Sequence, residues 1–439
     1  METHSRSELY LLSCGANSYG QLGQGHDEDQ SEPRLCDHCP ALRARVRAVS
    51  GGGGHSVLVT ENGEVYVCGQ NHRGQLGLGH TSNISSFQLC LGLNQKVTGV
   101  ACGWEFTLFI TDGGQLLACG SNAFGQLGVE ESVTHSLDPR LVEVLKEPVV
   151  SVAAGLRHSL AATGSGCVYQ WGTGLLNQAK RALSPQPVPS YLCSKVPCLV
   201  PGLDLRKSYR VAAGSAHSVC LTDGDLFLWG SNKHCQLLSS DPFVPCPRPL
   251  RRSLLQEENV GNVWCGWTHV VAQTESGRVF TWGRGDYGQL GRPPPTNQGP
   301  TQTSAEGVLP SEVKDLCGAT QISCGSEHNL ALVGSRLFSW GWNEHGMCGN
   351  GSQINVIHPQ LISALRRPLL IGCGAGHSLV VCMAAFIVYL QLEHEQHTFP
   401  SPCAQAGIFS RFRPVSCWQC VCSLVKLFGP SRPKNGCVR

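Results

Sequence analysis

The chain repeats one short pattern seven times, at intervals of 51 to 58 residues. Each copy has a small apolar run that ends in Trp-Gly or Cys-Gly, and these pairs begin at Cys14, Cys68, Cys119, Trp171, Trp229, Trp282 and Trp340. Each pair is followed by a Gly-x-x-His motif, which ends at His55, Phe106 (the single exception to His), His158, His217, His269, His328 and His377. A period of this length, kept seven times, indicates a repeat architecture.

Within each repeat the sequence predicts two strands joined by a tight turn. In one copy, apolar residues 55–60 and 64–69 flank Glu61-Asn62-Gly63, which is typical of an antiparallel hairpin. A unit of this length holds four strands, which is the size of a propeller blade. The 52 glycines fit a protein with many tight turns. We therefore predict an all-β protein, a seven-bladed β-propeller.

The two ends of the repeat region complement each other. Residues 9–15 carry a strand with its Cys-Gly but have no Gly-x-x-His before them, whereas residues 371–382 carry Gly-x-x-His without the next strand. We predict that the N-terminal strand closes the last blade, because closure removes the open edges of the sheet. The predicted propeller spans residues 8–382, and residues 383–439 form a non-repeat tail that we expect to be poorly ordered.

The loops after the Trp-Gly or Cys-Gly pairs carry a family resemblance. Asn17–Gly23, Asn71–Gly77 and Asn122–Gly128 share the pattern Asn-x-x-Gly-Gln-Leu-Gly, and residues 286–291 repeat most of it. This pattern resembles the regulator of chromosome condensation family. The resemblance implies a propeller that binds a small GTPase and stimulates nucleotide release, with the position before each His facing the GTPase.

Some segments depart from the pattern. The unit around Trp171 lacks Gly-Gln-Leu-Gly, and Cys235 and Leu238 replace its glycines in the next unit, so we expect irregular loops in both. Residues 175–209 and 292–316 are proline-containing insertions, which we expect to be surface loops. The sequence is compatible with two alternatives: these loops bind a partner, or they are tolerated insertions without a function. One Cys-x-x-Cys pair in the tail is weak support for a zinc site.

Composition limits the kinds of partner. A net charge of +2 with 15% charged residues gives no field that would attract nucleic acid. Seven of the 24 cysteines stand at positions where aligned repeats have Ala or Trp, so we interpret Cys in the repeats as a small apolar residue in a reducing compartment, the cytoplasm and also the nucleus. The apolar run at residues 379–390 is too short to span a bilayer. We expect a monomer that needs no cofactor.

Strand direction predicts that the Gly-x-x-His loops and the Asn-x-x-Gly loops share one face of the propeller. We interpret the six repeated His as structural residues, because equivalent positions around a ring cannot converge on one metal. Candidate partner-binding residues are those that vary within the loops: Trp104, Trp267 and Trp342, and, before the His column, Glu105, Arg157, Thr268 and Glu327. Trp packing on its own blade is the alternative interpretation.

No motif for covalent catalysis is present, so the protein is not predicted to be an enzyme in that sense. The first functional hypothesis is a guanine nucleotide exchange factor-like regulator that acts through a small GTPase or an exocyst-type secretory partner. The second is a propeller scaffold without exchange activity. A chromatin-docked regulator is a third alternative, which the lack of a basic N-terminal arm disfavours.

Overall fold

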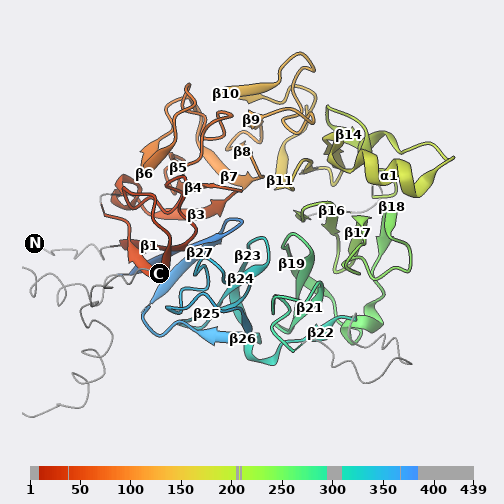
Figure 1. Ribbon diagram of the computed structural model, residues 1–439. Coiled ribbons are helices and arrows are strands. Elements are labelled where there is room, and N and C mark those ends of the chain that lie inside the picture. The colour runs from red at the N-terminus through yellow and green to blue at the C-terminus, as the bar shows by residue number, and fades with distance from the viewer. Residues whose placement is uncertain are drawn as a thin grey trace, which may run out of the picture. The chain divides into compact units, whose positions relative to one another are not determined.

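The computed structural model describes residues 9–37, 39–203, 207, 210–293, 309–365 and 367–383. Seven four-stranded antiparallel sheets surround a central axis (Figure 1). The seven-bladed β-propeller predicted from the repeat is confirmed. The tail from residue 384 and most of the insertion at 292–316 lie outside the described residues, so the predictions for them stay predictions.

The first four blades follow one another along the chain. Blade 1 contains β3 (Val46–Gly51), β4 (His55–Thr60), β5 (Val65–Gly69) and β6 (Ile84–Leu89). Blade 2 contains β7 (Val97–Cys102), β8 (Phe106–Thr111), β9 (Leu116–Ser121) and β10 (His135–Leu141). Blade 3 contains β11 (Val149–Ala154), β12 (Ser159–Thr163), β13 (Val168–Trp171) and β14 (Cys198–Leu199). Blade 4 contains β15 (Arg210–Ala213), β16 (His217–Leu221), β17 (Leu226–Ser231) and β18 (Phe243–Pro249).

The remaining blades complete the circle. Blade 5 contains β19 (Val260–Cys265), β20 (His269–Thr274), β21 (Val279–Gly283) and β22 (Ser311–Glu312). Blade 6 contains β23 (Ala319–Cys324), β24 (His328–Val333), β25 (Arg336–Gly341) and β26 (Val356–Leu361). Blade 7 contains β27 (Pro368–Cys373), β28 (His377–Met383), β1 (Leu9–Gly15) and β2 (Gln30–Leu35). Short 3-10 helices lie in the connections: η1 (Pro40–Arg43), η4 (Arg252–Leu255) and η6 (Lys314–Leu316).

Blade 7 is assembled from both ends of the repeat region. β1 pairs antiparallel with β28, in a register that runs from Leu9 opposite Met383 to Gly15 opposite His377. The predicted closure by the N-terminal strand is therefore confirmed. The N-terminal segment also supplies β2, the outermost strand, which pairs with β1. Half of the last blade thus comes from the beginning of the chain (Figure 1).

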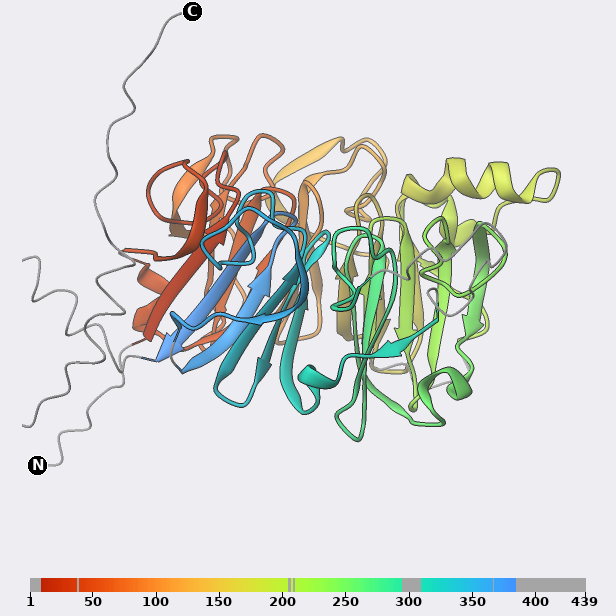
Figure 2. The same ribbon diagram turned by 60° about the horizontal axis from the view of Figure 1, so that its bottom comes forward.

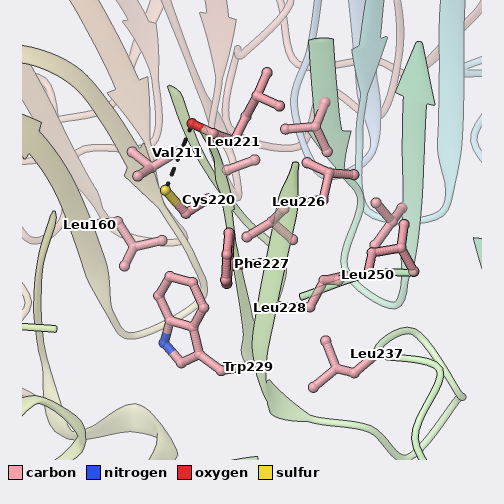
Figure 3. Packing of buried hydrophobic residues seen from close by; sticks show 14 of the residues in the cluster. Leu160, Val211, Cys220, Leu221, Leu226, Phe227, Leu228, Trp229, Leu237 and Leu250 are labelled. Atoms are coloured by element: carbon pink, nitrogen blue, oxygen red, sulfur yellow. Dashed lines mark hydrogen bonds between the residues drawn. The ribbon is translucent and has the colours of Figure 1, made fainter. Parts of the chain in front are cut away.

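The core lies within the blades and between their faces. Trp171, Trp229, Trp282 and Trp340 are fully buried. In Figure 3, Trp229 lies among the apolar side chains of blade 4, near Leu160 of blade 3. The Trp340 indole Nε1 donates to the Gln289 carbonyl of the preceding blade at 3.0 Å. Where a copy has Cys instead, as at Cys68, the thiol donates to the equivalent carbonyl, that of Gln21, at 3.5 Å.

The insertion at 175–209 lies at the surface, as predicted, but part of it forms helices and a strand instead of a loop, and a few of its side chains are buried. It contains η2 (Thr173–Leu175), α1 (Leu176–Leu183) and η3 (Ser190–Leu192) and supplies β14. Figure 2 shows α1 along one edge of the propeller. Ala179, Tyr191 and Leu192 are buried in the core shared by blades 3 and 4, and the Tyr191 hydroxyl donates to the Pro245 carbonyl of β18. Apolar side chains at these positions explain the packing.

The loop around Cys235 and Leu238 keeps the regular geometry, which corrects the prediction of an irregular loop. Both residues adopt left-handed backbone angles, with φ of 58° and 54°. The amide of Leu237 still donates to Asn232 Oδ1 at 2.8 Å, as Leu22 does to Asn17 in the first copy. The network of side-chain and backbone hydrogen bonds therefore imposes the turn even where glycine is missing, at a conformational cost.

Candidate functional site

One face of the propeller collects the repeated loops, and we call it the loop face. It carries the Gly-x-x-His loops and the loops that follow each Trp-Gly or Cys-Gly pair. The two kinds of loop are joined directly: the Trp342 amide donates to the Glu327 carbonyl, and the Ser121 amide to the Glu105 carbonyl, both at 2.8 Å. The hairpin turns between the second and third strands lie on the opposite face, which we call the hairpin face.

The spacing Gly-x-x-His has a steric cause. The imidazole of the fourth residue lies directly against the Cα of the first, so a Cβ built on Gly214 would stand 2.0 Å from His217 Cε1. Phe106 lies against Gly103 in the same way, with the same 2.0 Å approach to its ring. Any side chain at the first position would displace the ring. Glycine is therefore required by the packing of an aromatic ring, whether the ring is His or Phe.

The His side chains join neighbouring blades through a chain of hydrogen bonds. His55 Nε2 lies 2.9 Å from Thr107 Oγ1 in the next blade, and this hydroxyl donates to the Gln75 carbonyl at 2.7 Å. Because the hydroxyl proton is used, His55 Nε2 is the donor of the pair. Equivalent contacts to the next blade are made by His158, His269, His328 and His377.

Burial keeps most of these rings neutral. It lowers the pKa of His55, His217 and His328 to about 3 and that of His158 and His377 to about 4. Burial and a neutral ring are what a structural role requires, and five of the six His rings also contact the next blade. Among the described residues, no three His, Cys, Asp or Glu side chains gather into a group that could hold a metal ion.

His217 differs from the other five. The residue that faces it in blade 5 stands directly after His269 and is Val270, which has no hydroxyl. Within the described residues, neither nitrogen of the fully buried His217 ring has a hydrogen-bond partner. The sequence shows this difference, since Ser, Thr or Asn follows most copies of the His column and Val follows His269. Which His loses its partner depends on the contact between blades.

The Gly-x-x-His loops surround the propeller axis and are linked to each other. The Trp267 amide donates to the Ser326 carbonyl at 2.7 Å, and the Ala375 amide to the Gly52 carbonyl at 2.9 Å. A cavity of about 80 Å³ lies on the axis and is lined by these loops and by the ends of the inner strands, including Cys102 and Cys265. Glycine is the most frequent residue in this lining.

Two of the three predicted tryptophans meet across this axis. The rings of Trp104 in blade 2 and Trp267 in blade 5 have centroids 5.2 Å apart and are tilted by 55°. Blades 3 and 4 separate these two blades in the circle, so the two rings meet across the axis, where both residues line the cavity. Trp104 remains 38% exposed. A pair of partly exposed indoles at the centre of a face is a typical anchor for a protein partner.

The third tryptophan belongs to a separate aromatic group. Trp342 lies 6.4 Å from the Tyr287 ring and 5.8 Å, edge-on, from the His345 ring. The Arg284 guanidinium lies over Tyr287 at 4.7 Å, and His345 Nδ1 is 2.8 Å from Asp29 Oδ2. This group connects the loops of blades 5, 6 and 7.

The residues before the His column have different surroundings. Glu105 is partly exposed and its carboxylate is 3.0 Å from His72 Nε2. Arg157 is exposed and its guanidinium lies 4.4 Å from the centre of the Phe124 ring. Both contacts are made to the preceding blade, so these side chains lie over the seams between blades and remain accessible to a partner.

Glu327 is placed differently from what the sequence predicts for a partner-facing acid, because only 6% of it is exposed. Its carboxylate accepts hydrogen bonds from Thr268 Oγ1 at 2.7 and 2.8 Å and from Gln289 Nε2 at 2.8 Å. Burial alone would raise the pKa of Glu327, but the interactions with His269, Thr268 and Gln289 outweigh burial and hold the pKa below its usual value. Glu327 is therefore an ionised group inside the loop face.

The family model described as RCC1-like domain matches residues 10–380 of this chain. The chain belongs to the RCC1-like domain family. The match covers all seven blades, and the loops that carry the Gly-Gln-Leu-Gly pattern are those of the loop face described above.

Known members of the RCC1-like family are similar over most of this chain. The secretion-regulating guanine nucleotide exchange factor of Mus musculus is 51% identical over 388 residues, which cover 85% of this chain and 83% of the relative. The protein of that name from Bos taurus is 48% identical over 406 residues, which cover 89% of this chain and 87% of the relative. The crystal structure of Prp20p from Saccharomyces cerevisiae, 22% identical, covers 89% of this chain and 95% of its own with a TM-score of 0.74, a likeness of fold.

Proposed function

We propose that this protein is a guanine nucleotide exchange factor-like regulator that binds a small GTPase on its loop face and acts in secretion. The observation that carries the proposal is the 51% identity, over 85% of the chain, to the murine secretion-regulating guanine nucleotide exchange factor. We place the protein in the cytoplasm and also in the nucleus. Free thiols at all cysteines of the described residues support a reducing compartment.

Nucleotide exchange requires a binding surface and no covalent chemistry. An exchange factor binds the nucleotide-free GTPase more tightly than the loaded form, and this difference in affinity releases the nucleotide. The loop face offers partly exposed aromatic side chains at Trp104, Trp267 and Trp342, beside the charged Glu105 and Arg157. Aromatic anchors supply affinity, and charges at their edge steer association and select the partner.

The burial of Glu327 favours a second candidate function. Two acids, Glu105 and Glu327, occupy the position that the family resemblance places against a GTPase, and Glu327 is enclosed by Thr268 and Gln289. A propeller with this arrangement can bind a GTPase or an exocyst-type secretory protein as a scaffold without releasing nucleotide. The two functions differ in one measurable quantity, the rate of nucleotide release from the GTPase at a saturating concentration of this protein.

The test measures release of fluorescent GDP from a panel of small GTPases, together with capture of each GTPase in its nucleotide-free form. We expect Trp267→Ala to weaken capture about thirtyfold, from a loss of about 2 kcal/mol for a central aromatic anchor. Leu91→Ala is the control, because Leu91 is 78% exposed and follows β6 on the hairpin face. Capture without accelerated release would assign the protein to the scaffold function, and absence of both would refute a GTPase partner within the panel.

A further inference from the structure

Glu327 is unusual in its burial. Among the described residues it is the only Asp, Glu, Lys or Arg that is buried. Removing a carboxylate from water is costly unless hydrogen bonds replace its hydration. Each oxygen of Glu327 is within 2.8 Å of a donor, and His269 Nδ1 lies 3.7 Å from Oε2. The interior of the loop face is thus built to hold this one charge.

The donors to Glu327 come from three different loop segments. Thr268 belongs to the Gly-x-x-His loop of blade 5 and directly follows Trp267. Gln289 belongs to the loop after β21, and its own Oε1 accepts from the Tyr287 amide at 2.9 Å. The Glu327 carbonyl accepts from the Trp342 amide at 2.8 Å. Each segment joined to Glu327 therefore carries one aromatic side chain of the loop face.

Further interactions make the site rigid and charged. His269 Nε2 is 2.7 Å from Asn329 Oδ1, and Asn329 Nδ2 donates to the Gln289 carbonyl at 3.0 Å. His234 and Arg284 interact electrostatically with Glu327 from the loops of blades 4 and 5. Buried hydrogen bonds between loops of this kind fix the positions of the groups that they join.

We propose that Glu327 is a positioning residue, whose buried carboxylate fixes the loops of Trp267 and Tyr287 as one partner-binding surface. Trp342 joins this surface through its contact with the Tyr287 ring, because its amide bonds the main-chain carbonyl of Glu327 and not the carboxylate. The inference rests on the proposed function for the identity of the partner, a small GTPase. Glu327 acts through the three aromatic residues and does not touch the partner. Among the described residues one other acid stands before the His column, Glu105, and it is partly exposed and pairs with His72 rather than with a Thr and a Gln.

An acceptor is required at this position because both carboxylate oxygens face donors. Glu327→Leu introduces an apolar side chain of comparable size and leaves the Thr268 hydroxyl and the Gln289 amide without their acceptor. Glu327→Gln is the matched variant: its amide oxygen can still accept from Gln289, and its NH2 group can donate to the Thr268 hydroxyl, which also accepts. The pair of variants tests positioning, since Glu327→Gln keeps the hydrogen bonds while removing the charge.

The first readout needs no partner. The full chain is labelled with 5-fluorotryptophan, and the ¹⁹F resonances of Trp267 and Trp342 are assigned with Trp→Phe variants. We expect both resonances to shift or broaden in Glu327→Leu and to stay close to their original positions in Glu327→Gln. Glu258→Leu is the control, because Glu258 pairs with Arg278 at 2.8 Å away from the loop face. Unchanged Trp267 and Trp342 resonances in Glu327→Leu would overturn the proposal.

The second readout uses the nucleotide-free small GTPase that the wild type captures in the panel. We expect Glu327→Leu to weaken capture about tenfold, as one lost buried hydrogen bond predicts, and Glu327→Gln to retain most of the wild-type capture. Shifted resonances with unchanged capture would overturn the role in partner binding. If the wild type captures no GTPase, the proposed function fails, and the ¹⁹F spectra alone then decide the positioning role.

Discussion

Buried neutral histidines make this propeller sensitive to mild acid. Five rings in the His column have a pKa of about 3 or 4 in the folded protein, whereas an unfolded His titrates near 6.5. A folded pKa below the unfolded value means that the unfolded chain binds more protons as the pH falls below about 6.5. Stability is therefore greatest above this pH and decreases as the solution is acidified toward the folded pKa.

The size of the effect follows from the unfolded state. Between pH 7.5 and pH 5.5 each of these His lowers the free energy of unfolding by about 1.4 kcal/mol, and the five together lower it by about 7 kcal/mol. A typical domain has a total stability of about 5–15 kcal/mol, so the loss is a large part of it. The magnitude at pH 5.5 is insensitive to the folded pKa as long as that value stays below about 4.5.

His217→Phe isolates one ring of the column. Phe106 shows that the fold accepts Phe at this position, and His217 has no hydrogen bond to lose within the described residues. We expect a variant that is at least as stable as the wild type at pH 7.5 and loses about 1.4 kcal/mol less on acidification to pH 5.5. His55→Phe is the matched control: it shows the same change in pH dependence but loses about 1–3 kcal/mol at pH 7.5, because its bond to Thr107 is removed.

The assay is urea unfolding followed by circular dichroism between pH 7.5 and 5.5. Equal wild-type stability at both ends of this range would refute the assignment of neutral buried rings. An acid dependence in His217→Phe as steep as that of the wild type would show that His217 is not one of the titrating groups.

Three further predictions follow from the fold. Deleting residues 1–15 removes β1, so we expect loss of the cooperative unfolding transition or appearance of oligomers; a monomer with the wild-type melting temperature would contradict closure of blade 7. Cys235→Gly should stabilise the protein by about 1 kcal/mol, because glycine adopts the left-handed backbone of this position without strain. Leu238→Gly should stabilise it less, because Leu238 packs against the core, and equal effects in urea unfolding would contradict this expectation. A double-mutant cycle of Trp104→Ala and Trp267→Ala should give a coupling of about 0.5–1.5 kcal/mol, and zero coupling would show that the pair is not formed in solution.

The sequence predicted features that each repeat encodes by itself. The hairpin, the Gly-x-x-His spacing and the Trp-Gly pair depend on contacts within a blade or with an equivalent neighbour, so seven copies gave the same signal seven times. Closure could be predicted because each terminus lacks the half that the other supplies. The positions of Cys14, Cys68 and Cys119 in the Trp column indicated their apolar role, and the structure places them in the same slots.

Irregular positions were harder to predict, because a break in the pattern does not say what replaces it. The sequence predicted irregular loops around Cys235 and Leu238, yet the hydrogen bonds of Asn232 hold the regular turn. It predicted a surface loop at 175–209, yet Tyr191 and Leu192 are buried against blade 4. In both segments, packing and hydrogen bonds from elsewhere in the chain outweigh the local preference for a loop.

The number of blades, the closing strand and the loops that make up the loop face were determined by the sequence alone, because their causes are steric and local. Only the tertiary structure decided which of their residues act together. Trp104 meets Trp267 because a closed ring brings two non-neighbouring blades to one axis, and Glu327 is buried because Thr268 and Gln289 of the adjacent blade enclose it. Contacts between repeats depend on the side chain that the other repeat presents, and no single repeat contains this information.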